Sequence, residues 1–399
     1  MLVNSIILAA VLLAALVLML PRLASAKGWQ ATITPLASII GSGFLVLGPI
    51  LGASYGKFAP LVMLALCVCA YLFGAAIRFN IHQIATSADK RAPLTLKIET
   101  VSSWALAFAY IVSVAYYLNL FGAFAVSLTS VDDPYHAKLL TTGMLLLILI
   151  VGWTRGYGAL ERMEQVSVSV KLAIIAGLLV GLALFFAKQA GTQELLFNPA
   201  KQTGWAGVTL AFGLIVTVQG FETSRYLGDE YDARTRITSM RRAQWISGLI
   251  YMIYIGLLAY VFAPADIKLD ETAIIDMMAI VAPILPVLLV AAALSAQFSA
   301  AVADTSGAGG LFTEVTKNKL KPKQSYVLLV GAGIVLTWSA NIFEIISYAS
   351  RAFAFYYSLQ AIIAALGAYR IRKYALTISF IALVILGLLI VVFGVPVEG

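Results

Sequence analysis

Apolar stretches long enough to cross a lipid bilayer recur along the whole 399-residue sequence, from Leu2–Leu20 at its start to residues 374–395 near its end. A transmembrane helix needs about 20 consecutive, mostly apolar residues. The sequence is 61% hydrophobic and only 12% charged, whereas about 25% of the residues in soluble domains are charged. The fold class is therefore predicted to be all-α, that of a polytopic membrane protein.

The hydropathy pattern predicts about twelve membrane spans. The first is Leu2–Leu20. The small residues Ala24-Ser25-Ala26 after it resemble a signal-peptidase site, but no positive charge precedes the apolar run, which favours a retained helix over a cleaved signal peptide. The other spans are expected at 31–54, 59–82, 98–128, 137–153, 163–187, 206–222, 243–263, 273–314, 325–339, 343–369 and 374–395.

The positive charges fall mainly on one side of this arrangement. Of the 27 lysines and arginines, Lys171 and Arg351 lie deep inside predicted spans, and the loops and span ends predicted on the outer side carry only Lys57, Lys138, Lys188, Lys201 and Lys268. An excess of Lys and Arg marks cytoplasmic loops. Both termini are therefore predicted outside, in a bacterial inner (plasma) membrane. The net charge of +8 reflects this orientation and gives no reason to expect nucleic-acid binding.

Metal and nucleotide chemistry find little support in the sequence. Cys67 and Cys69 lie two residues apart in one apolar span and so face different directions, and the two histidines, His82 and His136, fall in opposite loops. There is no Gly-x-x-x-x-Gly-Lys-[Ser/Thr] phosphate-binding loop, so direct use of ATP is not expected. No cofactor is expected, with coupling to Na⁺ or H⁺ left open.

Two predicted spans are interrupted by glycine and polar residues. The segment 31–54 contains Ile39-Ile40-Gly41-Ser42-Gly43-Phe44, and the segment that begins at 206 contains Gln219-Gly220-Phe221-Glu222. Unwound backbone is tolerated at membrane depth only where it is buried in protein or lines a cavity. Interrupted helices of this kind bind substrate in transporters built from inverted repeats. The alternative is that the small residues only let neighbouring helices approach.

The positions of the two interruptions favour the transporter interpretation. Each interrupted span opens a group of five, and the two groups enter the membrane from opposite sides, which is the arrangement of an inverted repeat. The predicted units are an extra N-terminal transmembrane helix at 1–27, a first repeat at 28–187, a second at 188–370 and an additional C-terminal helix at 371–399.

These motifs resemble those of the amino acid–polyamine–organocation (APC) superfamily of permeases, which have the LeuT-type five-plus-five inverted-repeat fold with helices 1 and 6 broken. The resemblance rests on the Gly-Ser-Gly stretch in helix 1 and on Gly-Phe-Glu in helix 6, followed by Asp229-Glu230 and Arg236. It rests also on the lysine in Val166–Lys171 and on Leu320-Lys321-Pro322-Lys323, and it covers about residues 31–370.

The resemblance implies a substrate site between the two interruptions. Backbone amides of the first would meet a carboxylate, because the positive end of the half-helix that begins near Phe44 adds to their attraction. Carbonyls of the second would accept an ammonium group. Phe221 is read either as a gate or as packing, and Tyr116, Tyr117 and Asn119 either as pocket residues or as ordinary packing. The predicted substrate-binding residues are Ile40, Gly41, Ser42, Gly43, Phe44, Tyr117, Val218, Gln219, Gly220, Phe221 and Glu222.

Three further ionisable groups lie inside predicted spans, where such groups are costly and often functional. Lys171 and Asp304 fall at similar depth, which predicts an ion pair. In the resembled family a lysine at this place occupies the space in which sodium-coupled relatives bind Na⁺, so Lys171, Asp304, Thr305 and Ser306 are predicted to couple transport to an ion. Arg351 is expected to bind a substrate carboxylate, to pair with Glu222, or to extend toward the membrane surface. Glu222 itself either holds the broken helix or carries protons.

The function expected from these features is secondary active transport of amino acids or related small amines by alternating access. Proton coupling or exchange is favoured, and no enzymatic activity is expected. Two alternatives remain. One is a symporter of a nucleobase, organic cation or inorganic ion on the same fold, and the other is a membrane sensor or partner subunit that does not transport. The expected partners are a small-molecule substrate and the lipid bilayer; the oligomeric state is open.

Overall fold

A computed structural model describes residues 2–41, 43–87, 92–154, 158–227, 231–317 and 319–397. Ser42 and the pair Asp229-Glu230 lie outside these ranges. Throughout the described residues the secondary structure is helical, and eight stretches are long and apolar enough to cross a membrane. The protein is thus an all-α polytopic membrane protein, as its composition predicts.

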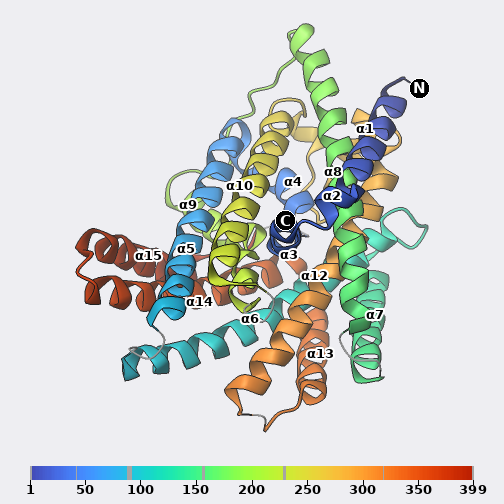
Figure 1. The fold of residues 1–399 in the computed structure, drawn as a ribbon. Helices are drawn as coiled ribbons and strands as arrows, with labels where there is room; N and C mark the ends of the chain where they lie inside the picture. The colour runs from blue at the N-terminus through green and yellow to red at the C-terminus, as the bar shows by residue number, and fades with distance from the viewer. Residues whose placement is uncertain are drawn as a thin grey trace.

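Each predicted span corresponds to one helix or to two or three consecutive helices, whose arrangement Figure 1 shows. The first half of the chain contains α1 (Leu2–Met19), α2 (Pro21–Ala24), α3 (Lys27–Ile39), α4 (Gly43–Tyr55), the 3₁₀ helix η1 (Gly56–Phe58), α5 (Ala59–Ser87), α6 (Pro93–Val126), α7 (Pro134–Thr154) and α8 (Gly158–Gly191). The second half contains α9 (Gly204–Gly213), the 3₁₀ helices η3 (Ile215–Val218), η4 (Phe221–Tyr226) and η5 (Pro264–Asp266), α10 (Ala233–Leu258), α11 (Ala273–Val281), α12 (Leu285–Val315), α13 (Pro322–Ser339), α14 (Ile342–Arg370) and α15 (Tyr374–Phe393).

Local sequence explains where several of these helices begin. The Asp232 carboxylate accepts the Thr235 amide at 2.6 Å and caps α10. Asn341 and Glu344 form a reciprocal capping box at the start of α14, each side chain accepting the other residue's amide at 2.9 Å. Proline stands in the first turn of α6 and of α12, where its missing N–H costs nothing.

The prediction of one continuous helix over 273–314 is wrong. The chain forms α11, breaks at Ala282, whose backbone is extended (φ −161°, ψ 136°), and resumes as α12 at Leu285. Pro283 follows the break directly. Proline disfavours the helical conformation in the residue before it and lacks the N–H that an uninterrupted helix would need.

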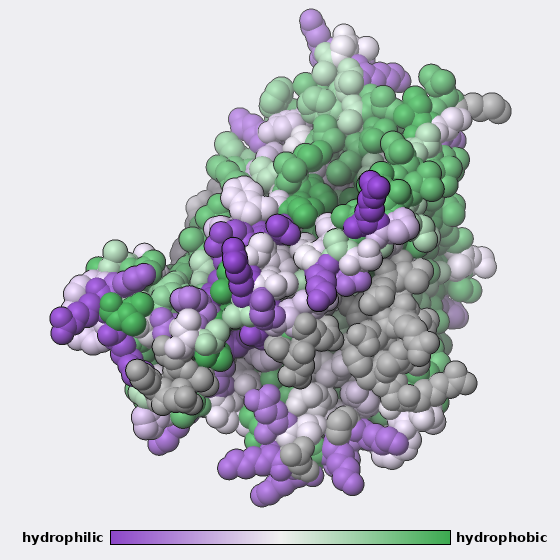
Figure 2. Space-filling view, viewed as in Figure 1, coloured by the Kyte–Doolittle hydropathy of each residue, from purple (hydrophilic) through white to green (hydrophobic). Residues whose placement is uncertain are grey.

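The α6 helix occupies the centre of the bundle and packs against α12 and α14 (Figure 1). Its buried residues continue from Leu106 to Leu120 with few gaps, so α6 contacts protein on nearly all sides. The α10 helix packs against α5 and α3, and α14 packs against α15. Seen from the same side, hydrophobic residues cover the upper part of the surface, and hydrophilic residues gather over the middle and lower parts (Figure 2).

The extra N-terminal helix α1 packs along α8. Its only buried residue, Ile7, lies against Gly177 and Gly181, which are spaced four apart on α8. A Cβ added at Gly181 would lie 3.0 Å from Ile7 Cδ1, and one added at Gly177 would overlap Val11 Cγ2. Small residues at this spacing let two membrane helices approach closely, which explains how a helix with a mostly lipid-facing surface is held.

The predicted division into two repeats stays a prediction. Its boundary at 187/188 falls near the end of α8, and its boundary at 370/371 falls at the end of α14.

Candidate functional site

The first predicted interruption is present. The α3 helix ends at Ile39, and Ile40 leaves the helical conformation (φ −83°, ψ 54°) while its amide still donates to the Leu36 carbonyl. The chain resumes as α4 at Gly43. The described residues Ile40 and Gly41 therefore lie outside both helices, within the predicted span 31–54, as the glycines predict.

The second interruption is also present. The α9 helix ends at Gly213, and η3 leads to Gln219, which is extended (ψ 177°), before η4 starts at Phe221. Between them Gly220 has φ +115°, a left-handed conformation that residues with a Cβ rarely adopt. The sequence places glycine at the position in this segment that requires it.

The two interruptions touch each other. A Cβ on Gly43 would lie 2.7 Å from Cα and Cβ of Thr217 in η3. A Cβ on Gly220 would lie 2.6 Å from the carbonyl carbon of Ser38 and 2.7 Å from the amide nitrogen of Ile39. Each unwound segment thus uses a glycine to lie against the backbone of the other.

Tyr251 of α10 holds both segments at once. Its hydroxyl lies 2.6 Å from the Thr217 carbonyl and 3.0 Å from the Ile39 carbonyl. Both carbonyls lie where the helices break, so they lack part of the hydrogen bonding that a continuous helix would supply. Sequence reasoning missed this residue because a tyrosine in an apolar helix reads as ordinary packing.

We expect Tyr251→Phe to loosen the contact between the two interruptions, because it leaves two buried carbonyls without their shared donor. The cost of such a loss is about 1–3 kcal/mol. Tyr254→Phe is the matched control, since the Tyr254 hydroxyl makes a single long hydrogen bond, 3.3 Å to the Leu45 carbonyl. Thermal unfolding of the purified variants measures the difference. Equal midpoints for the two variants would contradict the role given to Tyr251.

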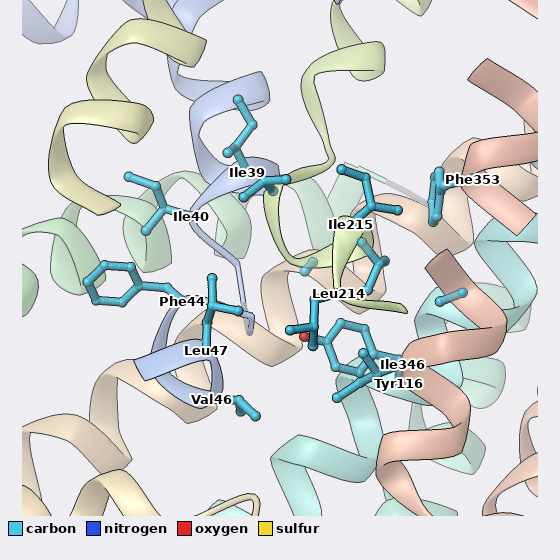
Figure 3. Close-up of a cluster of buried hydrophobic side chains, with 14 of the residues drawn as sticks. Ile39, Ile40, Phe44, Val46, Leu47, Tyr116, Leu214, Ile215, Ile346 and Phe353 are labelled. Carbon is cyan, nitrogen blue, oxygen red and sulfur yellow. The ribbon is translucent and has the colours of Figure 1, made fainter. Parts of the chain in front are cut away.

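Apolar side chains surround the interruptions (Figure 3). Ile39, Ile40 and Phe44 lie beside the first, and Leu214 and Ile215 beside the second, all buried. Phe44 packs on Tyr254 with ring centroids 4.4 Å apart. The residues nearest the two unwound segments therefore form a mainly apolar and aromatic shell.

Phe221 is buried and stacks on Tyr357 of α14, with centroids 5.1 Å apart and an interplanar angle of 21°. Of the two interpretations of Phe221, this arrangement corresponds to core packing. Asn119 donates to the Thr337 hydroxyl of α13 at 2.9 Å and to the Ala115 carbonyl of its own helix at 2.8 Å. Of its two interpretations, these contacts correspond to packing between helices. Val218 is buried in η3 beside Gln219.

Two buried oxygens at the second interruption have no hydrogen-bond donor among the described residues: Gln219 Oε1 and Glu222 Oε1. The side-chain nitrogen Nε2 of Gln219 donates to the Tyr117 hydroxyl at 2.9 Å. The other carboxylate oxygen of Glu222 accepts the Gly220 amide at 3.0 Å and the Tyr357 hydroxyl at 2.8 Å. Glu222 thus holds the glycine turn and also offers an unused acceptor.

Tyr117 connects the two interruptions from α6. Besides accepting from Gln219, its ring lies near Gly41, where an added Cβ would be 3.9 Å from Cε1. The structure therefore brings together Tyr117 and the described residues of both interruptions, among them Gly41, Gly43, Gln219 and Gly220.

Lys171 of α8 is buried, and its ammonium donates to the Ala37 carbonyl at 2.6 Å. Ala37 lies in the last turn of α3, where carbonyls lose their helical partners. A positive charge at this end also interacts favourably with the helix dipole. Lys171 therefore links α8 to the half-helix that ends at the first interruption.

Asp304 of α12 is buried and accepts a hydrogen bond from the Ser113 hydroxyl of α6. The hydroxyl of Thr305 donates to the Ala301 carbonyl of its own helix at 2.6 Å, and Ser306 is half-buried. The direct ion pair between Lys171 and Asp304 stays a prediction.

Arg351 of α14 contacts the end of α15. Its Nε donates to the Gly394 carbonyl at 2.9 Å, and a second guanidinium nitrogen contacts the same oxygen. Gly394 follows the last residue of α15, so the guanidinium caps a helix C-terminus. The proposed pairing with Glu222 is not formed in this structure.

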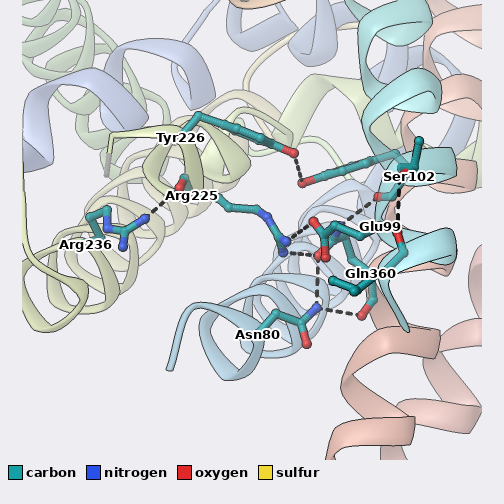
Figure 4. Close-up of polar contacts among 10 residues, drawn as sticks. Asn80, Glu99, Ser102, Arg225, Tyr226, Arg236 and Gln360 are labelled. Atoms are coloured by element: carbon teal, nitrogen blue, oxygen red, sulfur yellow. Dashed lines mark hydrogen bonds and ion pairs between the residues drawn. The ribbon is translucent and has the colours of Figure 1, made fainter. Parts of the chain in front are cut away.

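A buried polar cluster joins η4 to three other helices (Figure 4). The Arg225 guanidinium forms an ion pair with Glu99 of α6 and donates to the Gln360 side chain of α14. Gln360 in turn donates to Ser102 at 2.7 Å and accepts from Asn80 of α5 at 2.9 Å. Sequence reasoning missed this cluster; the lone acid Glu99 near the start of span 98–128 was its only signal.

The Arg225 cluster lies on η4, directly after the second interruption in the chain. Arg236 of α10 donates to the Arg225 carbonyl at 2.7 Å and fixes the end of η4. Breaking a buried ion pair costs several kcal/mol. The cluster therefore ties η4 to α5, α6 and α14 directly after the second interruption.

Comparison with known proteins supplies the family. A profile described as APC superfamily transporter matches residues 21–394. An uncharacterized protein of Aquifex aeolicus (strain VF5) is 42% identical over 385 residues, covering 95% of this chain and 93% of the relative. The matched region includes both interruptions, Lys171, Asp304 and the Arg225 cluster. The chain belongs to the APC superfamily of transporters.

Proposed function

We propose that this transporter is a secondary active carrier of a small zwitterionic amine, and most directly of an amino acid, on a LeuT-type inverted-repeat fold. The observation that carries the proposal is the direct contact between two unwound segments inside the bundle, at Gly43–Thr217 and Gly220–Ser38. Paired interruptions in opposite halves mark the substrate site of such carriers. Transport then requires no covalent chemistry and no enzymatic role.

The two ends of a zwitterion would bind different interruptions. The α4 helix begins at Gly43, and its first amides carry the partial positive charge of a helix N-terminus, which suits a carboxylate. The unused oxygens of Gln219 and Glu222 accept hydrogen bonds and suit an ammonium group, which has only donors.

The substrate side chain would be neutral and apolar. Ile40, Phe44, Leu214 and Ile215 are the buried side chains closest to the interruptions (Figure 3). Arg351, the cation predicted to bind a substrate carboxylate, is engaged at the end of α15. A charged side chain would have to leave water for this shell without a partner, at a cost of several kcal/mol.

Coupling is proposed to run through Lys171. While protonated, the ammonium holds the Ala37 carbonyl and so fixes the end of α3 beside the first interruption. Loss of the proton would leave a neutral amine, whose hydrogen bond to Ala37 is weaker because it is no longer charge-assisted, and would end the attraction to the helix dipole. The α3 helix would then be freer to move against α8. Proton coupling or proton-linked exchange follows without Na⁺, because the ammonium supplies the positive charge. The proposed setting is the bacterial inner membrane, with both termini outside.

Uptake by reconstituted vesicles tests the proposal. Vesicles that contain the protein should accumulate labelled neutral apolar amino acids when an inward proton gradient is imposed, and protein-free vesicles should not. Nucleobases, organic cations and Na⁺ or K⁺ tracers serve as parallel substrates for the alternative symporter. Binding without accumulation would indicate the non-transporting sensor, and accumulation of another substrate class would replace the amino-acid assignment.

We expect Lys171→Met to separate binding from coupling. The variant should keep the thermal stabilisation given by substrate, because Lys171 contacts α3 outside the unwound segment, and should lose the dependence of uptake on the proton gradient. Lys188→Met is the control: it removes an exposed charge near the end of the same helix. If Lys171→Met retains the wild-type pH profile, Lys171 is only a structural residue.

A further inference from the structure

A small basic pocket lies between the start of α3 and the first turns of α10, at the end of the bundle predicted to face the cytoplasm. Its volume is about 170 Å³, and it is lined by Gly28, Arg234, Thr235, Thr238, Ser239 and Arg242. Pockets for whole drug-sized ligands are about 300 Å³ or larger. This one suits a compact group.

Two arginines supply its charge. Arg234 and Arg242 are eight residues apart and therefore lie on one face of α10, two turns apart. Both are exposed, and neither forms an ion pair with any residue in the described ranges. Asp232, two residues before Arg234, interacts electrostatically with it but forms no ion pair, and its carboxylate accepts the Thr235 amide as the helix cap. The Arg236 guanidinium points instead to the Arg225 carbonyl.

The start of α3 supplies backbone donors. The Trp29 and Gln30 amides donate to the Ala26 carbonyl, whereas the amides of Lys27 and Gly28 have no acceptor in the described part of the chain. A Cβ on Gly28 would lie 3.3 Å from a terminal nitrogen of Arg242, so the guanidinium reaches this helix start. Guanidinium groups, hydroxyls and free amides together form a donor set for an oxyanion.

Aromatic residues place the pocket at the level of lipid headgroups. Trp29 follows Gly28 on α3, and Trp245, three residues after Arg242, is 66% exposed. Tryptophan is enriched where membrane proteins meet the headgroup region. Basic pockets between helices on the cytoplasmic side bind phosphorylated headgroups.

We propose that this pocket binds a phosphate group, supplied either by the headgroup of an anionic phospholipid or by free phosphate. The bound group would join the two arginines of α10 to the first turn of α3. Because α3 ends at the first interruption and α10 carries Tyr251, phosphate binding would stabilise the packing of α3 on α10. The proposal does not depend on which substrate is transported.

The test compares thermal unfolding of the full-length protein in phosphatidylcholine vesicles with and without phosphatidylglycerol. Wild type should gain about 2 °C or more from the anionic lipid. The variant Arg234→Gln/Arg242→Gln should lose the gain. The control Arg241→Gln/Lys321→Gln removes the same charge from exposed residues outside the pocket and should retain it.

A second arm uses detergent-solubilised protein with inorganic phosphate, against chloride at equal ionic strength. A pocket-dependent shift here identifies free phosphate as a sufficient ligand, and a shift seen only in vesicles identifies the lipid headgroup. No shift in either arm, or an equal loss in pocket and control variants, would overturn the proposal. An equal loss in the pocket and control variants would show that the thermal shift depends on the overall surface charge of the protein and not on the pocket.

Discussion

Gly220→Ala is expected to remove most of the folded, substrate-binding protein. Gly220 has φ +115°, and holding a residue with a Cβ in such a conformation costs about 1–3 kcal/mol. The new Cβ would also lie 2.6 Å from the Ser38 carbonyl carbon, a backbone atom that cannot rotate away. Overpacking adds about 1–3 kcal/mol. The backbone strain and the overpacking together amount to a large part of the free energy of unfolding of a typical protein, about 5–15 kcal/mol.

Two glycine variants serve as comparisons for Gly220→Ala. Gly331→Ala in α13 should be neutral or slightly stabilising, because nothing lies within 4 Å of its added Cβ and alanine favours a helix. Gly43→Ala should also be severe, since its Cβ would meet the Thr217 backbone at 2.7 Å. Yield of monodisperse protein, thermal midpoint and substrate-induced stabilisation are measured together. A Gly220→Ala protein with the midpoint of Gly331→Ala would show that the interruptions do not touch.

The interruptions were predictable because two constraints act on the same short stretches. The bilayer supplies no water to unwound backbone, so glycine and polar residues inside an apolar span mark a break buried in protein. Gly220 shows a second, stereochemical constraint, since only glycine suits its φ of +115°. Both constraints are local, so the sequence alone reveals them.

Contacts between distant segments were not predictable in the same way. A charged residue in an apolar helix suggests function, but Arg351 caps α15, and this depends on where a helix 43 residues further along ends. Glu99 and Arg225 are 126 residues apart and meet only in the folded bundle. The Tyr251 hydroxyl contacts two carbonyls, of Ile39 and Thr217, that are far apart in the sequence and adjacent only in the folded protein, so its role could not be predicted.

The break between α11 and α12 could not be predicted from hydropathy. Pro283 and Pro286 are visible in the sequence, yet the surrounding residues are apolar throughout 277–294. Hydropathy alone therefore merges α11 and α12 into one span. A bilayer tolerates proline in a helix when neighbouring groups satisfy the freed backbone, so the residue type alone does not decide between a kinked helix and two separate ones.

Arg225→Met is expected to have the second-largest effect, by removing the cation of the buried cluster. Breaking a buried ion pair by deleting one partner costs about 3–5 kcal/mol. The Glu99 side chain is 22% exposed and can regain some hydration, so we expect the lower end, about 3 kcal/mol. The Gln360 side-chain oxygen also loses the hydrogen bond that it accepts from the Arg225 guanidinium. The thermal midpoint measures this loss.

The control for Arg225→Met is Lys268→Met, which breaks the Lys268–Asp276 pair. Both side chains of that pair are 64% exposed, and exposed pairs contribute about 0–1 kcal/mol. The double variant Glu99→Leu/Arg225→Met should recover much of the loss, because replacing both partners by apolar groups avoids leaving a charge in the interior. If Arg225→Met costs no more than Lys268→Met, or if the double variant loses the sum of the two single effects, the cluster does not hold η4 against α6.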